Sequence, residues 1–340
     1  MNGVFNIEVG NLLALLYYAQ PNPCKHTRIH NYFSSFTWPK HLGGINGIGK
    51  DAFQKRSSIE GSFSPGHASD CMGVFGLLEV FLALEIGTTG DSKLNAALHC
   101  YGALCLLVRM LMSLPRGTVT ADQLMKAVIL HHRLFLQCYG DGEWVPKFHY
   151  CFHFAFHFAI HGYLIGCLAL ERKHKEPKRE ATVLANFNKT TQPERSILLA
   201  MVHSHFRSLD DKSTIPCSAA YLETPCEAGP GICKMLTSMY GRHGEICAGL
   251  SVRLEHFAFH QADFVSAKYP DNAKSVGQVL CNASFNGQCW SVIEIWNITP
   301  KVYCYARTAE VIAIKSERVL DTLVYSMHGD VAVVVPSNRM

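Results

Sequence analysis

The sequence has few charged residues for its length. Charged residues make up 17% of the 340 residues, whereas hydrophobic residues make up 48%. Disordered chains have the opposite balance, so this composition excludes intrinsic disorder and predicts large packed cores. The formal net charge is only +4, so any function that depends on basic residues must reside in a local cluster. Length alone predicts about two domains.

The sequence also lacks a secretory signal and a clean membrane span. Residues 1–11 have no basic region and no cleavage-site pattern. The longest apolar stretches, 97–114 and 153–170, contain Arg109 and three histidines respectively. Neither reaches about 20 uninterrupted apolar residues. We therefore expect an intracellular protein without a membrane partner, in which both stretches are buried helices.

Paired cysteine motifs are missing as well, although the chain has 14 cysteines. No pair has C-x-x-C spacing, and the gaps of nine, seven and fourteen between Cys217, Cys226, Cys233 and Cys247 do not match a zinc module. Cysteines inside apolar runs, such as Cys100, are expected to behave as small hydrophobic residues. Reduced thiols are the default without an export signal.

The first two-thirds of the chain has helical periodicity. Apolar residues recur at helical spacing over 5–19, 72–86, 94–114, 120–138 and 196–207. Thr120-Ala-Asp-Gln123 is a capping box, which marks the start of a helix.

The period changes after residue 275. Segments 276–283, 290–296 and 302–314 are rich in β-branched or aromatic residues, and 323–327 and 331–335 flank a turn at His328-Gly-Asp330. The sequence therefore predicts an α+β protein with a helical region at 1–215, an irregular junction at 216–244 and a small β-rich domain at 245–340.

One segment, PKFHYCFHFAFHFAIH from Pro146, places a histidine at every fourth position: His149, His153, His157 and His161. The same residues alternate like a strand, but the length of the apolar run favours a helix, on which the four share one broad face. Histidines at i and i+4 can bind one zinc ion, so His149 and His153 are candidate metal ligands. The alternative is a row of half-buried histidines at a packing seam, since no H-E-x-x-H motif is present.

A basic cluster follows in ERKHKEPKRE, which starts at Glu171. Its five cations are Arg172, Lys173, Lys175, Lys178 and Arg179. Such a cluster can contact phosphates, or it can be the solvated end of a helix. Glu171 itself can form an ordinary ion pair or bind a divalent metal.

These motifs together resemble a block in mobile-element proteins. The block consists of Pro146-Lys-Phe-His149-Tyr-x-x-His153, then Gly162-x-Leu-Ile, then Glu171-Arg-Lys-His-Lys with Lys178-Arg179. It is similar to the C-terminal region of CACTA (En/Spm-type) transposases and related mobile-element proteins of protist genomes. Gly3-Val-Phe-Asn-Ile-Glu8 and Gly277-Gln-Val279 also resemble those protist sequences. The matches cover the chain thinly, with this one dense block.

The resemblance implies an RNase H-like core with a large helical insertion, in which three carboxylates hold two Mg²⁺ ions. Glu171 matches the last of these carboxylates, and Lys147 with the five cations would contact DNA in the nucleus. The two earlier carboxylates are expected to be missing, so the chain is expected to be a C-terminal fragment or a decayed copy. His157, His161 and Pro177 depart from the family pattern.

Three functions follow as expectations. The leading one is a transposon-derived fragment that associates weakly with DNA and lacks a complete active site, so that it is not an enzyme as it stands. The second is a metal-binding protein or hydrolase that uses His149 and His153, with zinc as its metal. The third is a non-catalytic interaction module whose C-terminal sheet binds a partner. No strongly bound cofactor is expected, and the oligomeric state stays open.

Overall fold

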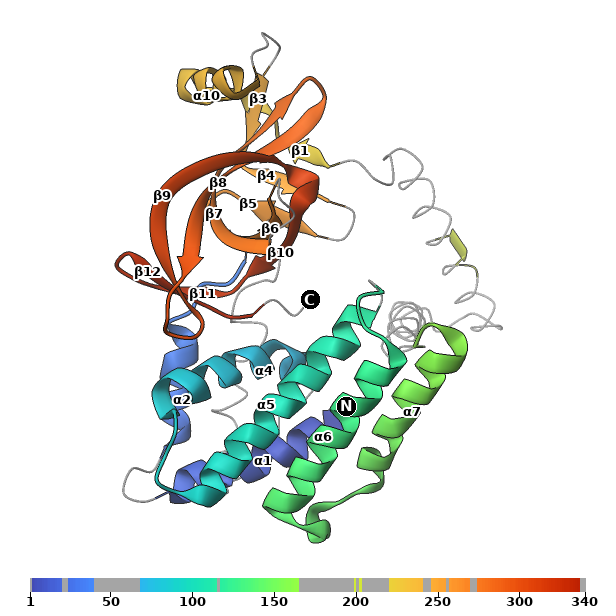
Figure 1. Cartoon of the computed structure of the whole chain (residues 1–340). Helices are drawn as coiled ribbons and strands as arrows, with labels where there is room; N and C mark the ends of the chain where they lie inside the picture. The colour runs from blue at the N-terminus through green and yellow to red at the C-terminus, as the bar shows by residue number, and fades with distance from the viewer. Residues whose placement is uncertain are drawn as a thin grey trace, which may run out of the picture. The chain divides into compact units, whose positions relative to one another are not determined.

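The computed structural model describes residues 2–19, 24–39, 68–114, 117–164, 199, 202–203, 220–240, 246–254, 257–269 and 274–336. Helices make up the N-terminal part, and a curled antiparallel sheet makes up most of the C-terminal part (Figure 1). The predicted α+β class is therefore confirmed. The helix predicted at 196–207 falls largely outside the described residues.

Five of the helices lie close to predicted ranges, and two, at 26–34 and 230–240, fall where no helix was predicted. The described helices are α1 (Asn2–Tyr18), α2 (His26–Ser34), α4 (Ala68–Phe81), α5 (Ser92–Ser113), α6 (Ala121–Tyr139), α7 (Pro146–His161) and α10 (Pro230–Tyr240). A π-helical turn (Leu82–Ile86) continues α4, and a 3-10 turn (Asp141–Glu143) precedes α7.

Helix α5 is central to the helical region, because it contacts α1, α4 and α6. Its first turn is capped by Asp91, whose carboxylate accepts hydrogen bonds from two backbone N–H groups. Arg109, the charge that interrupts the apolar run, forms a two-pronged ion pair with Glu79 of α4 at 2.5 and 2.8 Å. A paired guanidinium is tolerated in a packed helix, which explains the charge in this position.

The same helix is the one described helix that is long and apolar enough to cross a membrane. Half of its apolar window is buried against the rest of the protein. Cys100, Leu104 and Val108 are among the buried side chains. This burial matches the predicted core helix.

The start of α6 is the predicted capping box. The Thr120 hydroxyl accepts from the Gln123 backbone N–H at 3.2 Å, and the Gln123 side-chain oxygen accepts from the Thr120 N–H at 2.8 Å. Two backbone N–H groups that a helix start leaves without partners are thereby satisfied.

The strands extend from residue 221 to residue 334. They are β1 (Tyr221–Glu223), β2 (Cys226–Glu227), β3 (Ile246–Gly249), β4 (Ser251–Arg253), β5 (Ala258–His260), β6 (Phe264–Lys268), β7 (Lys274–Phe285), β8 (Gln288–Ile298), β9 (Cys304–Lys315), β10 (Val319–Leu323), β11 (Tyr325–His328) and β12 (Val331–Val334).

One sheet has the order β10-β6-β7-β8-β9-β12-β11, with β3 pairing β7 and β2 pairing β3; β1, β4 and β5 form a second sheet. All pairs are antiparallel, and β7, β8 and β9 are long and curved (Figure 1). The expected hairpin is present, since His328 pairs with Val331 across a two-residue turn. Trp296 is 2% exposed and packs edge-on against Phe264 at 5.0 Å, so it belongs to the sheet core.

The segment expected as an irregular junction, 216–244, contains regular elements instead. Strands β1 and β2 pair with β4 and β3, and α10 begins at Pro230. Proline suits the first position of a helix. The short strands gain their partners from later parts of the chain, and local composition does not reveal that pairing.

Candidate metal centres in the helical region

Segment 152–160, whose alternation also fitted a strand, lies within helix α7. The helix that the sequence favoured is therefore confirmed. Its buried side chains, Phe148, Cys151 and Ala155, are three and four residues apart and form one apolar stripe. This stripe packs towards α6, where the Phe135 ring lies 4.3 Å from the Phe148 ring.

The four histidines of α7 lie away from this stripe, and all four are exposed. The interpretation of half-buried histidines at a packing seam is therefore wrong. The seam is made by residues one position before or two positions after a histidine, because 3.6 residues complete a turn.

His149 and His153 are close enough to bind the same metal ion. The Nε2 atoms of His149 and His153 lie 3.3 Å apart, and their rings meet edge to face. Two nitrogens bound to one ion at about 2.0–2.1 Å are roughly 2.9–3.4 Å apart for bond angles between octahedral and tetrahedral. The pair therefore already has the spacing of two ligands on one ion.

The other predicted site residues divide into two groups. Lys147 lies exposed in the first turn of α7. Glu171 and the five clustered cations, Arg172, Lys173, Lys175, Lys178 and Arg179, lie outside the described residues.

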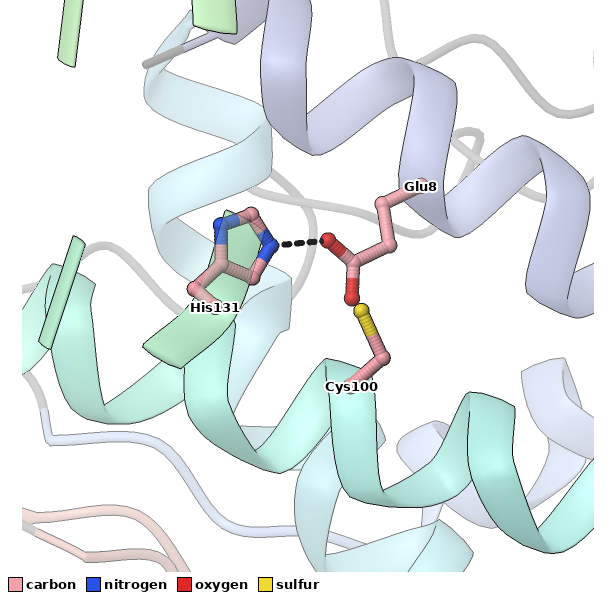
Figure 2. Close-up of side chains that lie close together, drawn as sticks. All are labelled: Glu8, Cys100 and His131. Carbon is pink, nitrogen blue, oxygen red and sulfur yellow. Dashed lines mark hydrogen bonds and ion pairs between the residues drawn. The ribbon is translucent and has the colours of Figure 1, made fainter. Parts of the chain in front are cut away.

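A second group of ligand-type side chains, which the sequence did not reveal, lies buried between three helices. Glu8 comes from α1, Cys100 from α5 and His131 from α6 (Figure 2). One ligand atom from each lies within 4.8 Å of the other two. Figure 2 shows the Glu8 carboxylate between the other two side chains, with one oxygen towards each.

Glu8 and His131 are both 0% exposed. The Oε2 atom of Glu8 lies 2.5 Å from Nε2 of His131. The other carboxylate oxygen faces the Cys100 thiol, with which Glu8 shares a side-chain hydrogen bond. The buried carboxylate therefore has a polar partner on each side.

The neighbouring His132 sets the proton positions of this group. Its Nε2 lies 2.7 Å from the Phe148 carbonyl, which can only accept, so Nε2 carries a proton. Burial is the main reason that the pKa of His132 is lowered to about 4, so the ring is neutral near pH 7 and its Nδ1 accepts. The facing atom, His131 Nδ1 at 3.2 Å, therefore donates. This leaves His131 Nε2 directed at Glu8.

The Cys100 thiol and the Tyr139 hydroxyl lie close enough to Glu8 for its charge to shift their pKa values. Burial raises the pKa of the Cys100 thiol, and the Glu8 carboxylate raises it further. Burial likewise raises the pKa of Tyr139, followed by the charge of Glu8. A hydrogen bond with the Cys138 side chain adds to the raised pKa of Tyr139.

Two sequence signals were present for this buried group. Glu8 is the one acidic residue in the otherwise apolar run of α1, and His131-His132 interrupts the apolar face of α6. Neither signal shows that the side chains meet, because residues 8 and 131 are 123 positions apart.

Comparison of the chain with protein-family models and with curated proteins finds no match. The described part of the helical region holds two groups of side chains of the types that bind metal ions. The resemblance to transposases stays a prediction from the sequence.

Proposed function

We propose that this chain is a metal-binding protein in which His149 and His153 of α7 bind a divalent transition-metal ion at the protein surface. The observation that carries the proposal is the 3.3 Å separation of their Nε2 atoms on an exposed helix face. Both nitrogens already have the bound spacing, and binding replaces the hydrogen bond between them with two bonds to the ion.

The donor atoms favour particular ions. Imidazole nitrogen suits Zn²⁺, Cu²⁺ and Ni²⁺, whereas Mg²⁺ and Ca²⁺ prefer oxygen. Two protein ligands leave the remaining positions to water, so the site is open and weaker than a closed structural site. Copper should bind more tightly than nickel or zinc, following the Irving–Williams order.

A double-mutant cycle tests this proposal. Isothermal titration with Ni²⁺ would be measured for the parent chain, His149→Ala, His153→Ala and the double variant. Chelation needs both rings, so each single change should lower affinity at least about tenfold, and the double variant should bind no more weakly than either single one. Lys147→Ala on the same helix is the control and should bind like the parent.

Small and additive losses would contradict the proposal, because they are the signature of imidazoles that bind ions independently. Parent-like binding in the double variant would refute it directly.

Association with duplex DNA is the second candidate function, as the resemblance to transposases suggests. The observation in its favour is that α7 presents Lys147 exposed to solvent in its first turn. With the five cations of 172–179, this lysine provides contacts for about 3–5 phosphates. In this proposal the chain is a nuclear, transposon-derived protein in which Glu171 is a remnant of an RNase H-like, Mg²⁺-dependent site.

Salt dependence of binding tests the second candidate. The logarithm of the DNA association constant should fall with that of the salt concentration with a slope of about −3 to −4.5. Replacing the five cations with Gln should flatten this slope, whereas Lys301→Gln with Lys315→Gln, on the exposed sheet surface, should not. Parent-like binding in the five-Gln variant would refute the DNA proposal. Mg²⁺-dependent cleavage that is lost in Glu171→Ala would show a complete active site.

A further inference from the structure

A buried carboxylate, thiol and imidazole meet where α1, α5 and α6 pack together (Figure 2). We propose that Glu8, Cys100 and His131 are the protein ligands of a buried zinc ion that links these three helices. This site is separate from the surface pair on α7 and does not depend on it.

The geometry needs only a small change to accept the ion. Ligand atoms at about 2.0–2.3 Å from a tetrahedral zinc ion lie roughly 3.3–3.6 Å apart. The ligand atoms of the cluster fall within 4.8 Å of one another, and the shortest pair, Glu8 Oε2 and His131 Nε2, is 2.5 Å apart. A shift of the Glu8 carboxylate by about 1 Å away from the His131 ring would lengthen the distance between Oε2 and Nε2 to the bound spacing.

The hydrogen-bond chain behind His131 prepares its ligand atom. The Phe148 carbonyl accepts from His132 Nε2, and His132 Nδ1 accepts from His131 Nδ1. Zinc-binding histidines commonly donate their other ring N–H to a fixed acceptor, which orients the ring and raises its basicity. His131 has this acceptor in His132, so its Nε2 is the ring nitrogen that faces Glu8 and that can bind the ion once its hydrogen bond to Glu8 gives way.

The second carboxylate oxygen of Glu8 faces the Cys100 thiol, and a side-chain hydrogen bond between the two groups adds to the raised pKa of that thiol. A zinc ion at this place would take the position of the thiol proton between Cys100 and Glu8. With three protein ligands, water would fill the fourth position of a tetrahedral ion.

The donor set selects the metal. Thiolate, imidazole and carboxylate together are typical zinc ligands, whereas Mg²⁺ and Ca²⁺ take oxygen ligands and leave thiols aside. On binding, the Cys100 S–H bond breaks and a Zn–S bond forms, and the proton held between Glu8 Oε2 and His131 Nε2 is released as well, so both protons pass to solvent.

The test uses the full chain with His149→Ala and His153→Ala, which removes the surface pair. Protein stripped with a chelator is titrated with Co²⁺, a coloured substitute for zinc. We expect one Co²⁺ per chain, with cobalt–thiolate charge-transfer absorption and the visible bands of a four-coordinate ion. Zn²⁺ should bleach both, and it should raise the melting temperature by about 5 °C or more.

Two single substitutions on α5 test whether Cys100 is the cysteine that binds the ion. Cys100→Ala should abolish the charge-transfer band and the thermal shift. Cys105→Ala is the matched control, because Cys105 is equally buried on the same helix and its thiol bonds to the Phe75 carbonyl instead. Both variants lose one sulfur from the core, so their loss of stability without metal should be similar.

If Cys100→Ala fails to fold, the charge-transfer band of the parent and its disappearance on chelation decide the question. Absence of this band at saturating Co²⁺ overturns the proposal and leaves Glu8 and His131 as a buried ion pair. An unchanged band in Cys100→Ala overturns it as well. Neither result affects the surface pair, whose titration uses the parent chain with His149 and His153 present.

Discussion

His132 should make the protein progressively less stable as the pH falls from about 6.5 to about 4. The side chain is 3% exposed and is surrounded by the rings of Trp144, Phe148 and Phe152, with centroids 4.9 to 5.5 Å away. Burial lowers its pKa to about 4, with a smaller contribution from His131 and an opposing one from the Phe148 carbonyl. An unfolded histidine has a pKa near 6.5.

The sign follows from which state binds the proton first. Below about pH 6.5 the unfolded chain protonates His132 while the folded chain keeps it neutral, so acid favours unfolding. The contribution is fully present above pH 6.5 and is lost by about 1.4 kcal/mol per pH unit down to pH 4. The total, roughly 3 kcal/mol, is a large part of the 5–15 kcal/mol that stabilises a typical domain.

Urea unfolding followed by far-ultraviolet circular dichroism, at pH 7.5 to 4.5 and with chelator present, measures this slope. His132→Leu should lose about 1 kcal/mol at pH 7 with its hydrogen bond, and its acid slope should be shallower by about 1.4 kcal/mol per pH unit. His99→Leu, an exposed position of α5, should keep the parent slope. Equal acid slopes in His132→Leu and the parent would refute this reasoning.

Two further predictions concern local structure. Thr120→Ala removes half of the capping box with Gln123 and should lower the free energy of unfolding by about 1 kcal/mol, whereas Thr120→Ser should restore most of it; equal melting curves for the two variants would contradict the cap. Gly277→Ala places a Cβ 2.2 Å from Ile293 Cγ2 and should destabilise the sheet by about 1–3 kcal/mol. Gly142→Ala has no atom within 4 Å and is the control; if both glycine variants melt alike, β7 and β8 are not packed as described.

The helices were predictable because their signals are local. The Thr120 capping box and the apolar periods of α1, α5 and α6 each lie within one stretch of chain. The hairpin at Gly329 was predictable for the same reason, since a turn sequence between alternating runs fixes the pairing of its own neighbours.

Segment 152–160 shows where local patterns stop being sufficient. Its alternation fits a strand and its spacing fits a helix, and only the length of the run favoured the helix that the structure shows. The exposure of the histidines was not predictable, because it depends on which face of α7 the neighbouring α6 covers. The Phe148 stripe, which packs on Phe135, settles that choice.

By itself, the sequence determined the long helices, the C-terminal hairpin, the α+β class and the histidines of α7 at every fourth position. The tertiary structure alone decided that Glu8, Cys100 and His131 share one buried space. The physical reason is that periodicity and capping act over a few residues, whereas this cluster depends on how three helices pack. In the sequence Cys100 is one more small apolar residue of a core helix, and only the packing of α1 against α5 places a carboxylate beside it.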